Sequence, residues 1–180
     1  MRIIVLDRDG VINQDSSDYI KSAEEWTPLE GSIEAIAELC KKGYKIYIAT
    51  NQAGLARGLF EPSDLDEMHN KLRRLVEDAG GEVSGIFFCP HHPDEQCGCR
   101  KPKPGLLEQI QSATQESLSG QPFVGDSLKD LQAAIAVGAK PVLVRTGNGK
   151  TTEIQLDHLT SDKVEVYDDL RAFAQQQVTL

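Results

Sequence analysis

Short apolar runs alternate with longer amphipathic stretches along the whole chain. The apolar runs are bounded by polar or glycine residues, a pattern that predicts strands buried on both faces. We expect six strands, at residues 3–6, 45–49, 86–88, 122–124, 141–144 and 164–166. Strands that alternate with helices form parallel β-α-β units. The sequence therefore predicts an α/β fold, built on a three-layer, doubly wound parallel sheet.

The helices between these strands carry start and stop signals. From residue 32 the apolar residues recur at helical spacing, with Ser32 as the expected N-cap and Gly43 as the stop. The same stripe makes Cys40 a small buried hydrophobe. A second helix is expected to begin with a capping box formed by Ser63 and Asp66. Further helices are expected, one from near Gly105, one through Ile135 to a stop at Gly138, and one after the last strand.

Length and charge narrow the classes of protein to consider. The 180 residues suit one domain, residues 1–180, with a substantial core. The net charge of -9 argues against a nucleic-acid-binding surface, but not against a small anionic substrate that is bound locally. No apolar run approaches the length of a membrane span, and no signal sequence precedes the first strand. We therefore expect a cytoplasmic monomer with no membrane or nucleic-acid partner.

Side chains that can do chemistry follow several of the expected strands. The carboxyl ends of parallel strands lie at one edge of a doubly wound sheet, where ligands bind. The residues expected there are Asp7, Asp9, Thr50, Asn51, Asp126 and Asp130, with Arg100, Lys101 and Lys103 from the loop before residue 105. A polar segment at residues 13–27, which includes Tyr19 and Trp26, is expected to form a loop at the mouth of this site.

This set of side chains favours a site that handles phosphate. Clustered carboxylates repel one another unless a cation lies among them, and oxygen ligands suit Mg²⁺, which keeps several waters and bridges to phosphate. Lysine, hydroxyl and amide donors beside the metal stabilise a transferring phosphoryl group. Each feature alone has a purely structural explanation; Ser127 and Asp130, for example, can simply cap a helix. Their joint occurrence at the strand ends favours phosphate chemistry.

Four stretches resemble the sequence motifs of the haloacid dehalogenase-like phosphatases. They are Asp-Arg-Asp-Gly at residues 7–10, Thr-Asn-Gln at 50–52, Arg-Lys-Pro at 100–102 and Gly-Asp at 125–126. The resemblance implies a Rossmann-like fold and makes Asp7 the nucleophile that forms an aspartyl-phosphate. It makes Asp9 the general acid for the leaving oxygen and then the general base for water.

The same resemblance implies roles for the other motif residues. The implied phosphate-binding and substrate-binding residues are Thr50, Asn51 and Gln52. Lys101 would neutralise charge around the phosphoryl group and the nucleophile. Asp126 would complete a Mg²⁺ site together with Asp7 and the backbone carbonyl of Asp9. Asp130 either supports this site indirectly or only caps a helix.

Within that family the resemblance is narrower. The stretches that carry it are residues 51–58, 89–93, 97–102 and 143–147. They are similar to a subfamily of heptose 1,7-bisphosphate 7-phosphatases that shares its motifs with histidinol-phosphatases. This implies removal of the C7 phosphate of D-glycero-D-manno-heptose 1,7-bisphosphate, with the C1 anomer left open, in ADP- or GDP-heptose precursor synthesis for lipopolysaccharide or surface polysaccharide. Arg57 and Arg100 would contact substrate phosphate or sugar, and histidinol phosphate is the alternative substrate.

Three cysteines and a histidine within eleven positions predict a metal site. The expected ligands are Cys89, His91, Cys97 and Cys99, with His92 as the alternative imidazole. Three thiolates and one imidazole are typical of a closed tetrahedral zinc site, whose role is structural because no coordination position stays open. Such an ion would hold the loop that carries residues 100–101. The simpler alternative is a surface loop with incidental thiols.

The spacing of the elements leaves no room for a separate cap domain, so we expect a capless enzyme. Specificity must then come from loops around Tyr19, Arg57 and the cysteine cluster. A hypothesis from a different class is a non-catalytic receiver-like or metal-binding module, because receiver domains also place an acceptor aspartate on a parallel sheet. That hypothesis leaves Asp9 and the cysteine cluster without a purpose.

Overall fold

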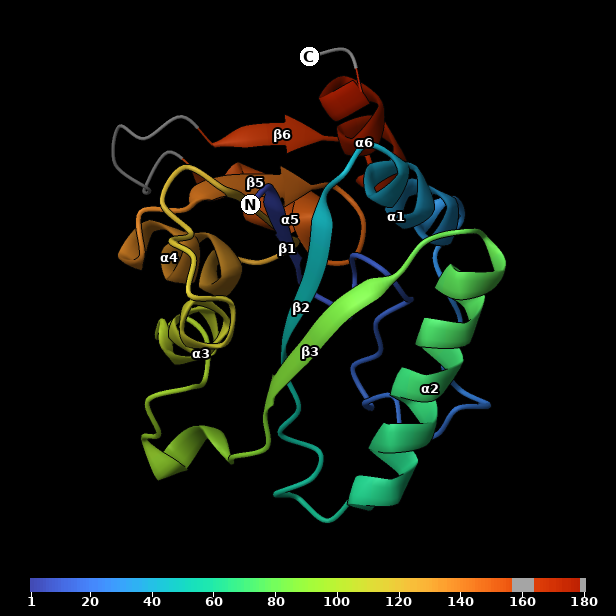
Figure 1. The fold of residues 1–180 in the computed structure, drawn as a ribbon. Coiled ribbons are helices and arrows are strands. Elements are labelled where there is room, and N and C mark those ends of the chain that lie inside the picture. Colours follow the sequence, from blue (N-terminus) through green and yellow to red (C-terminus); the bar gives the residue numbers. More distant parts are fainter. Residues whose placement is uncertain (157–163, 179–180) are drawn as a thin grey trace.

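Six parallel strands form one sheet in the computed structural model, which describes residues 1–156 and 164–178. The strands are β1 (Ile3–Leu6), β2 (Lys45–Asn51), β3 (Val83–Cys89), β4 (Pro122–Gly125), β5 (Lys140–Val144) and β6 (Glu165–Tyr167). Their order in the sheet is β3-β2-β1-β4-β5-β6. The chain therefore builds outward from β1 to β3, returns to the other side of β1, and builds outward again to β6 (Figure 1). This confirms the doubly wound, Rossmann-like topology.

Helices cover both faces of the sheet. They are α1 (Ser32–Lys41), α2 (Pro62–Asp78), α3 (Gly105–Thr114), α4 (Leu128–Ala136), α5 (Gly149–Ile154) and α6 (Leu170–Val178). Figure 1 shows α1, α2 and α6 on one side of the sheet and α3 and α4 on the other. The result is the predicted three-layer arrangement.

The alternation of side chains along β1 explains why both faces need cover. Ile4 and Leu6 belong to the apolar core under α1, α2 and α6, whereas Ile3 and Val5 belong to the core under α3 and α4. All four side chains are buried. Each buried side chain of this size contributes about 1.5–3 kcal/mol relative to an exposed one. A central parallel strand that is apolar on both faces thus holds the three layers together.

Two predicted helix starts are wrong. Gly31, in a left-handed conformation with φ of 77°, is the N-cap of α1, and the hydroxyl of Ser32 instead donates to the carbonyl oxygen of Val11 at 2.9 Å. The capping box of α2 consists of Glu61 and Asp64. Pro62 fixes that earlier start because proline suits the first helical position.

Two further differences concern single elements. Cys40 is only partly buried, and its sulfur exchanges hydrogen bonds with the backbone of Glu82 instead of packing as a pure hydrophobe. The short helix α5, which follows β5, was not predicted because its few residues carry no apolar stripe.

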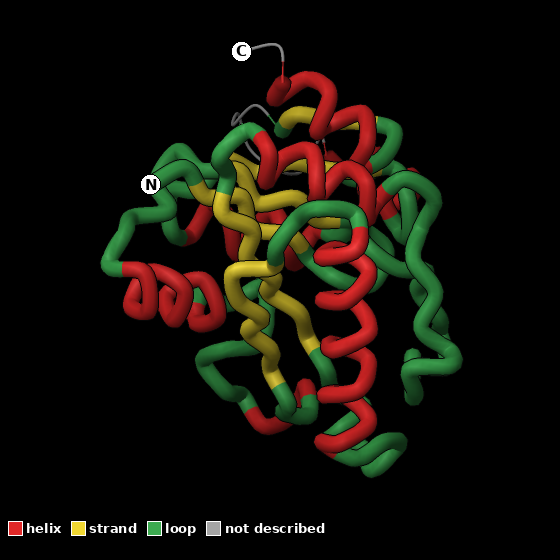
Figure 2. Tube along the Cα trace, turned by 45° about the vertical axis from the view of Figure 1, so that its right-hand side comes forward, coloured by secondary structure: helices red, strands yellow, loops and turns green. Residues whose placement is uncertain are grey.

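Two long connections lie at the carboxyl edge of the sheet, and Figure 2 shows them as loops. Residues 7–31 connect β1 to α1, and residues 90–104 connect β3 to α3 with one short 3₁₀ turn at Pro93–Glu95. The described part of the chain contains no inserted cap domain between β1 and β3. None of its helices is long and apolar enough to cross a membrane.

Candidate active site

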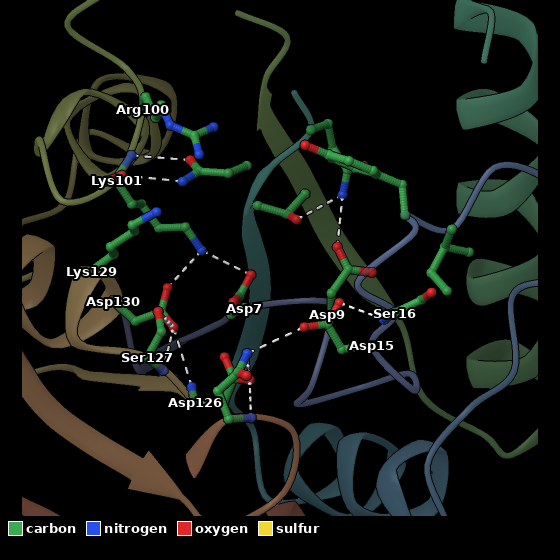
Figure 3. Close-up of a pocket in the computed structure, with 16 residues that line it drawn as sticks. Asp7, Asp9, Asp15, Ser16, Arg100, Lys101, Asp126, Ser127, Lys129 and Asp130 are labelled. Carbon is green, nitrogen blue, oxygen red and sulfur yellow. Dashed lines mark hydrogen bonds and ion pairs between the residues drawn. The ribbon is translucent and has the colours of Figure 1, made fainter. Parts of the chain in front are cut away.

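A cavity of about 260 Å³ lies beyond the carboxyl ends of β1, β2 and β4 (Figure 3). At this point the order of the strands reverses, because β2 and β4 lie on opposite sides of β1. This is the position at which doubly wound sheets bind ligands. The predicted site residues that line it are Asp7, Asp9, Thr50, Asn51, Gln52, Arg100, Lys101, Asp126 and Asp130. Lys103 was also expected there but does not line the cavity; its Nζ donates to the carbonyl oxygens of Gln96 and Cys97. Tyr19 and other residues of the 13–27 segment also line it, which confirms the expected loop at its mouth.

Lys101 lies at the centre of the site, between two carboxylates (Figure 3). Its Nζ is 2.8 Å from Oδ1 of Asp7 and 2.7 Å from Oδ1 of Asp130, and it donates to the carbonyl oxygen of Ala49 at 2.8 Å. Burial opposes the charged form, but the carboxylates of Asp130 and Asp7 outweigh it and raise the pKa of Lys101. The lysine is therefore a fixed positive charge beside Asp7.

Three carboxylates crowd together in this part of the cavity. Oxygens of Asp7, Asp126 and Asp130 lie within 4.8 Å of one another. Burial and the nearby charges of Asp130 and Asp126 raise the pKa of Asp7 well above its usual range, although Lys101 opposes the shift. Burial and Asp130 also raise the pKa of Asp126, to about 7. Crowded oxygen ligands with raised pKa values fit a divalent cation such as Mg²⁺, which would relieve their repulsion.

The carboxylate of Asp126 is clamped from several sides. Its Oδ2 accepts hydrogen bonds from the backbone N and the side-chain Nδ2 of Asn148, at 2.8 and 3.3 Å. Gly10 and Gly147, with φ of 82° and 55°, pack against the same oxygen, and a Cβ at either position would lie 2.2 Å from it. Its backbone carbonyl accepts from the hydroxyl of Thr152 at 2.8 Å. These contacts fix the direction in which Asp126 faces.

The two carboxylate oxygens of Asp130 have different partners. Its Oδ2 accepts from the backbone N of Asp126 and from the backbone N and hydroxyl of Ser127, at 3.2, 3.1 and 2.8 Å. It thereby closes the capping box at the start of α4. Its Oδ1 faces Lys101. Asp130 therefore both caps α4 and holds Lys101, which is more than the alternative of a helix cap alone allowed.

The carboxylate of Asp9 lies in a separate network. Its Oδ1 accepts from Nη2 and Nε of Arg8, at 2.8 and 3.2 Å, and from Nδ2 of Asn13 at 2.9 Å. Its Oδ2 accepts from Nε2 of Gln52 at 3.0 Å. Burial acts to raise the pKa of Asp9, but Arg8 and these hydrogen bonds lower it below its usual value. Asp9 thus has a different protonation preference from Asp7, two residues away.

Two residues of this network were missed from the sequence. Arg8 is 1% exposed, and its Nη1 lies 3.3 Å from Nε2 of His69, on the buried face of α2. A signal for His69 was available, because it shares the buried face of α2 with four residues that are all apolar: Leu65, Met68, Leu72 and Val76.

The Thr-Asn-Gln stretch at the end of β2 connects the parts of the site. The side chain of Asn51 donates to the carbonyl oxygen of Lys101 at 3.1 Å and accepts from its backbone N at 3.0 Å. Nε2 of Gln52 also donates to the hydroxyl of Thr50 at 2.9 Å. In this arrangement Asn51 holds the loop of Lys101, and Gln52 links Thr50 to Asp9.

The two predicted substrate arginines lie in different places. Arg100 lines the cavity, and its Nη1 is buried without a hydrogen-bond partner among the described residues. Arg57 is exposed and does not line the cavity; its guanidinium lies 6.0 Å from the ring centroid of Tyr19, which does. Arg100 therefore has an unused donor at the cavity, whereas Arg57 is connected to it through Tyr19.

The predicted metal cluster is assembled. Ligand atoms of Cys89, His91, Cys97 and Cys99 lie within 4.8 Å of one another. The sulfur of Cys97 is 3.6 Å from those of Cys89 and Cys99, close to the spacing of about 3.7 Å for sulfurs bound at 2.3 Å to a tetrahedral zinc ion. His92 instead accepts from the backbone N of Asp94. The donor set therefore fits a closed zinc site with His91 as its imidazole.

Comparison with known proteins agrees with this geometry. Residues 98–173 match the HAD-hydrolase-like family model. The chain is 52% identical to the D-glycero-β-D-manno-heptose-1,7-bisphosphate 7-phosphatase of Pseudomonas putida, with 99% of this chain and 100% of that protein covered. It is 51% identical to the enzyme of that name from Neisseria meningitidis serogroup A, with 97% and 94% covered.

Solved structures give the same result. The crystal structure of the D,D-heptose 1,7-bisphosphate phosphatase from B. bronchiseptica, complexed with magnesium and phosphate, matches with a TM-score of 0.96 and 47% identity over 99% of both chains. The corresponding phosphatase from Burkholderia thailandensis matches with a TM-score of 0.78 and 39% identity over the whole of both chains. The chain therefore belongs to the family of the D-glycero-β-D-manno-heptose-1,7-bisphosphate 7-phosphatases, within the HAD-like hydrolases.

Proposed function

We propose that this protein is a Mg²⁺-dependent phosphoric monoester hydrolase that removes the C7 phosphate of D-glycero-β-D-manno-heptose 1,7-bisphosphate. The observation that carries the proposal is the buried pair of Asp7 and Lys101, 2.8 Å apart at the cavity. A carboxylate fixed beside a permanent positive charge suits nucleophilic attack on a phosphoryl group. The assignment of the substrate rests on relatives at 52% and 51% identity, whose names specify the β anomer.

Two displacements at phosphorus account for the reaction. In the first, an oxygen of Asp7 attacks phosphorus and the bond from phosphorus to O7 of the sugar breaks. Asp9, whose lowered pKa favours the carboxylate, must first take up a proton, which it then gives to O7. In the second, the Asp9 carboxylate takes a proton from water and the water oxygen attacks the aspartyl-phosphate. The bond from phosphorus to Asp7 then breaks and inorganic phosphate leaves. Both aspartates return to their starting states.

Asp7, Asp126 and the backbone carbonyl of Asp9 would hold the Mg²⁺ ion. Asp130 is left to hold Lys101 and to cap α4, because both of its oxygens are engaged there. When bound, the ion supplies positive charge against the nucleophile and the phosphoryl oxygens. The raised pKa values of Asp7 and Asp126 support this assignment, since both carboxylates are held together at an electrostatic cost.

The substrate-binding residues divide into direct and indirect groups. We assign direct contact with phosphate or sugar to Thr50 and to Arg100, whose Nη1 lacks a partner at the cavity. The side chains of Asn51 and Gln52 act mainly by fixing Lys101 and Asp9, while Arg57 acts at the cavity mouth through Tyr19. Mutation of each group tests this division, because direct contacts affect KM first.

A structural zinc ion in the Cys89, His91, Cys97 and Cys99 cluster completes the proposal. The cluster immediately precedes Arg100 and Lys101, so an ion there would fix both side chains over the cavity. We further propose that residues 1–180 act as one phosphatase domain. A monomeric state, a cytoplasmic location and a place in ADP- or GDP-heptose precursor synthesis stay predictions.

The two alternatives are less well supported. A histidinol-phosphate phosphatase would share the mechanism, but the relatives named above are heptose bisphosphatases over nearly the whole chain. A receiver-like module needs one acceptor aspartate, and it gives no reason for the separate Asp9 network or for Arg100 at the cavity.

The deciding experiment measures phosphate release with and without Mg²⁺ from both anomers of the heptose 1,7-bisphosphate, from histidinol phosphate and from simple sugar phosphates. We expect Mg²⁺-dependent release with a preference for the β anomer, abolished in Asp7→Asn. A preference for histidinol phosphate would change the substrate and keep the mechanism. Full activity of Asp7→Asn would remove Asp7 from the role of nucleophile, and no release from any ester would restore the receiver-like hypothesis.

A further inference from the structure

Arg8 is a buried charge that the proposed reaction does not use. It lies between the nucleophile and Asp9 in sequence, it is 1% exposed, and its side chain donates to the carboxylate of Asp9. A buried guanidinium is costly unless its donors are paired. Arg8 pairs them on two sides, with the carboxylate of Asp9 and with the ring of His69.

The arrangement treats the two oxygens of Asp9 differently. Oδ1 receives two bonds from Arg8 and one from Asn13, whereas Oδ2 receives one bond, from Gln52. An oxygen that already accepts three hydrogen bonds has no free lone pair for a proton. Oδ2 is therefore the oxygen left to carry the transferable proton. Arg8 helps to fix its direction because two guanidinium nitrogens donate to Oδ1 and hold that oxygen on the far side of the carboxylate.

His69 holds Arg8 from the other side. Its Nε2 lies 3.3 Å from Nη1 of Arg8, and its ring packs against Phe88 with the centroids 6.0 Å apart. A ring nitrogen accepts a hydrogen bond from a guanidinium only when it is unprotonated. Burial and the nearby Arg8 and Arg73 lower the pKa of His69 to about 3, which keeps the ring neutral at working pH.

We infer that His69 and Arg8 are positioning residues that hold Oδ2 of Asp9 in the direction of the leaving oxygen. The inference rests on the proposed function, because Asp9 has a general acid's task only if an ester bond is broken. It adds a contact from α2, outside the four motif stretches, to the proton-transfer step.

The test uses two esters that differ in their need for a proton. The C7 oxygen of the heptose leaves as a poor alkoxide and needs the proton of Asp9, whereas p-nitrophenolate leaves without one. In His69→Leu we expect kcat for the heptose bisphosphate to fall about tenfold or more, part of the roughly 100- to 10,000-fold that general acid catalysis supplies, with little change in KM. The single-turnover burst of p-nitrophenolate should change less than about twofold.

Two further variants separate positioning from loss of stability. Gln places an acceptor oxygen near the position of Nε2, so His69→Gln should restore most of the heptose activity. Leu72→Ala removes a buried apolar side chain from the same face of α2 and leaves the hydrogen-bonding groups of His69 and Arg8 in place, so it should lower stability without changing the ratio between the two esters. Equal losses with both esters, a failed rescue by Gln, or the same split in Leu72→Ala would each overturn the inference.

The wild-type protein is assayed first, which keeps the two proposals distinguishable. If it releases phosphate from an alkyl phosphate other than the heptose bisphosphate, the substrate assignment fails and that ester takes the heptose's place in the test. If it releases phosphate from no ester, the proposed function and this inference fall together. A normal wild type without the split between esters overturns the inference alone.

Discussion

Asp7 and Asp9 are two residues apart, yet their surroundings oppose each other. Asp7 lies among carboxylates with one lysine, and Asp9 lies among donors with a buried arginine. The same isosteric change, from aspartate to asparagine, should abolish turnover at both positions. Its effect on the stability of the metal-free protein should differ in sign.

Asp7→Asn should stabilise the metal-free protein, because it removes a buried negative charge whose pKa is raised by burial and by Asp130 and Asp126. The expected result is a higher free energy of unfolding for Asp7→Asn than for wild type. Denaturant unfolding in the presence of a chelator measures it. A clear loss of stability would mean that the ion pair with Lys101 outweighs the repulsion.

Asp9→Asn should destabilise the protein by about 3 kcal/mol, because it leaves the guanidinium of Arg8 buried without its carboxylate. The same unfolding measurement applies, and Asp7→Asn is the matched comparison. Equal stability of Asp9→Asn and wild type would show that Asn13 and Gln52 alone satisfy this part of the site.

At the residue scale, the sequence was sufficient for groups that need only a strand end. Asp7, Thr50 and Asp126 were placed correctly because the end of a parallel strand fixes their position. The partners of Asn51 and Arg8 could not be predicted in this way. Asn51 bonds residue 101, and Arg8 meets His69 from a helix 61 positions later. Such contacts depend on how distant elements pack, which no local pattern records.

At the scale of elements, strands were easier to predict than helix ends. The apolar runs identified all six strands, although β2 ends two residues later than its run, and β3 begins three residues earlier and ends one residue later. The start of α2 was predicted wrongly because two capping patterns competed there. Ser63 with Asp66 fits the capping pattern as well as Glu61 with Asp64 does, and only the proline at residue 62 favours the earlier start.

The cysteine loop is the element whose order depends most on a metal, since residues 90–104 contain one short 3₁₀ turn and no other helix or strand. Removal of zinc with a tight chelator should lower the melting temperature by several degrees and raise KM, while the dependence on added Mg²⁺ survives. Cys97→Ser should reproduce the effect and lower the zinc content.

Cys40→Ser is the matched control for that experiment, because Cys40 lies in the last turn of α1 and its sulfur bonds the backbone of Glu82, outside the cluster. It should keep full zinc content and KM. Demonstrably metal-free protein with unchanged folding and kinetics would contradict a structural zinc site.

At the scale of the whole molecule, stability should depend on pH through two groups of opposite sign. The pKa of Asp126 is raised to about 7, so its stabilising protonated form is lost as the pH rises from about 4 to about 7. The pKa of His69 is lowered to about 3, so the folded state is penalised as the pH falls from about 6.5 to about 3. Between about pH 4 and pH 6.5, a rise in pH therefore lowers stability through Asp126 and raises it through His69.

The difference in stability between a variant and wild type therefore tests each pKa shift better than the pH dependence of wild-type stability alone. Relative to wild type, metal-free Asp126→Asn should gain stability as the pH rises from 4 to 7, by about 3 kcal/mol in total. His69→Gln should instead gain relative to wild type as the pH falls below about 6. Chemical unfolding at several pH values measures both, and flat differences would contradict the pKa directions on which they rest.

The clamp on Asp126 brings together three segments that are far apart in the chain. Gly10 follows the first strand, Asp126 follows the fourth, and Gly147 and Asn148 follow the fifth. During synthesis, the residues that would attack phosphorus, transfer the proton and bind phosphate are all made before Gly147 and Asn148, which fix Asp126. A nascent chain that ends before residue 147 would therefore hold the acids of a phosphatase without a competent metal site, and catalysis would begin only when the residues from Gly147 onward fold into place.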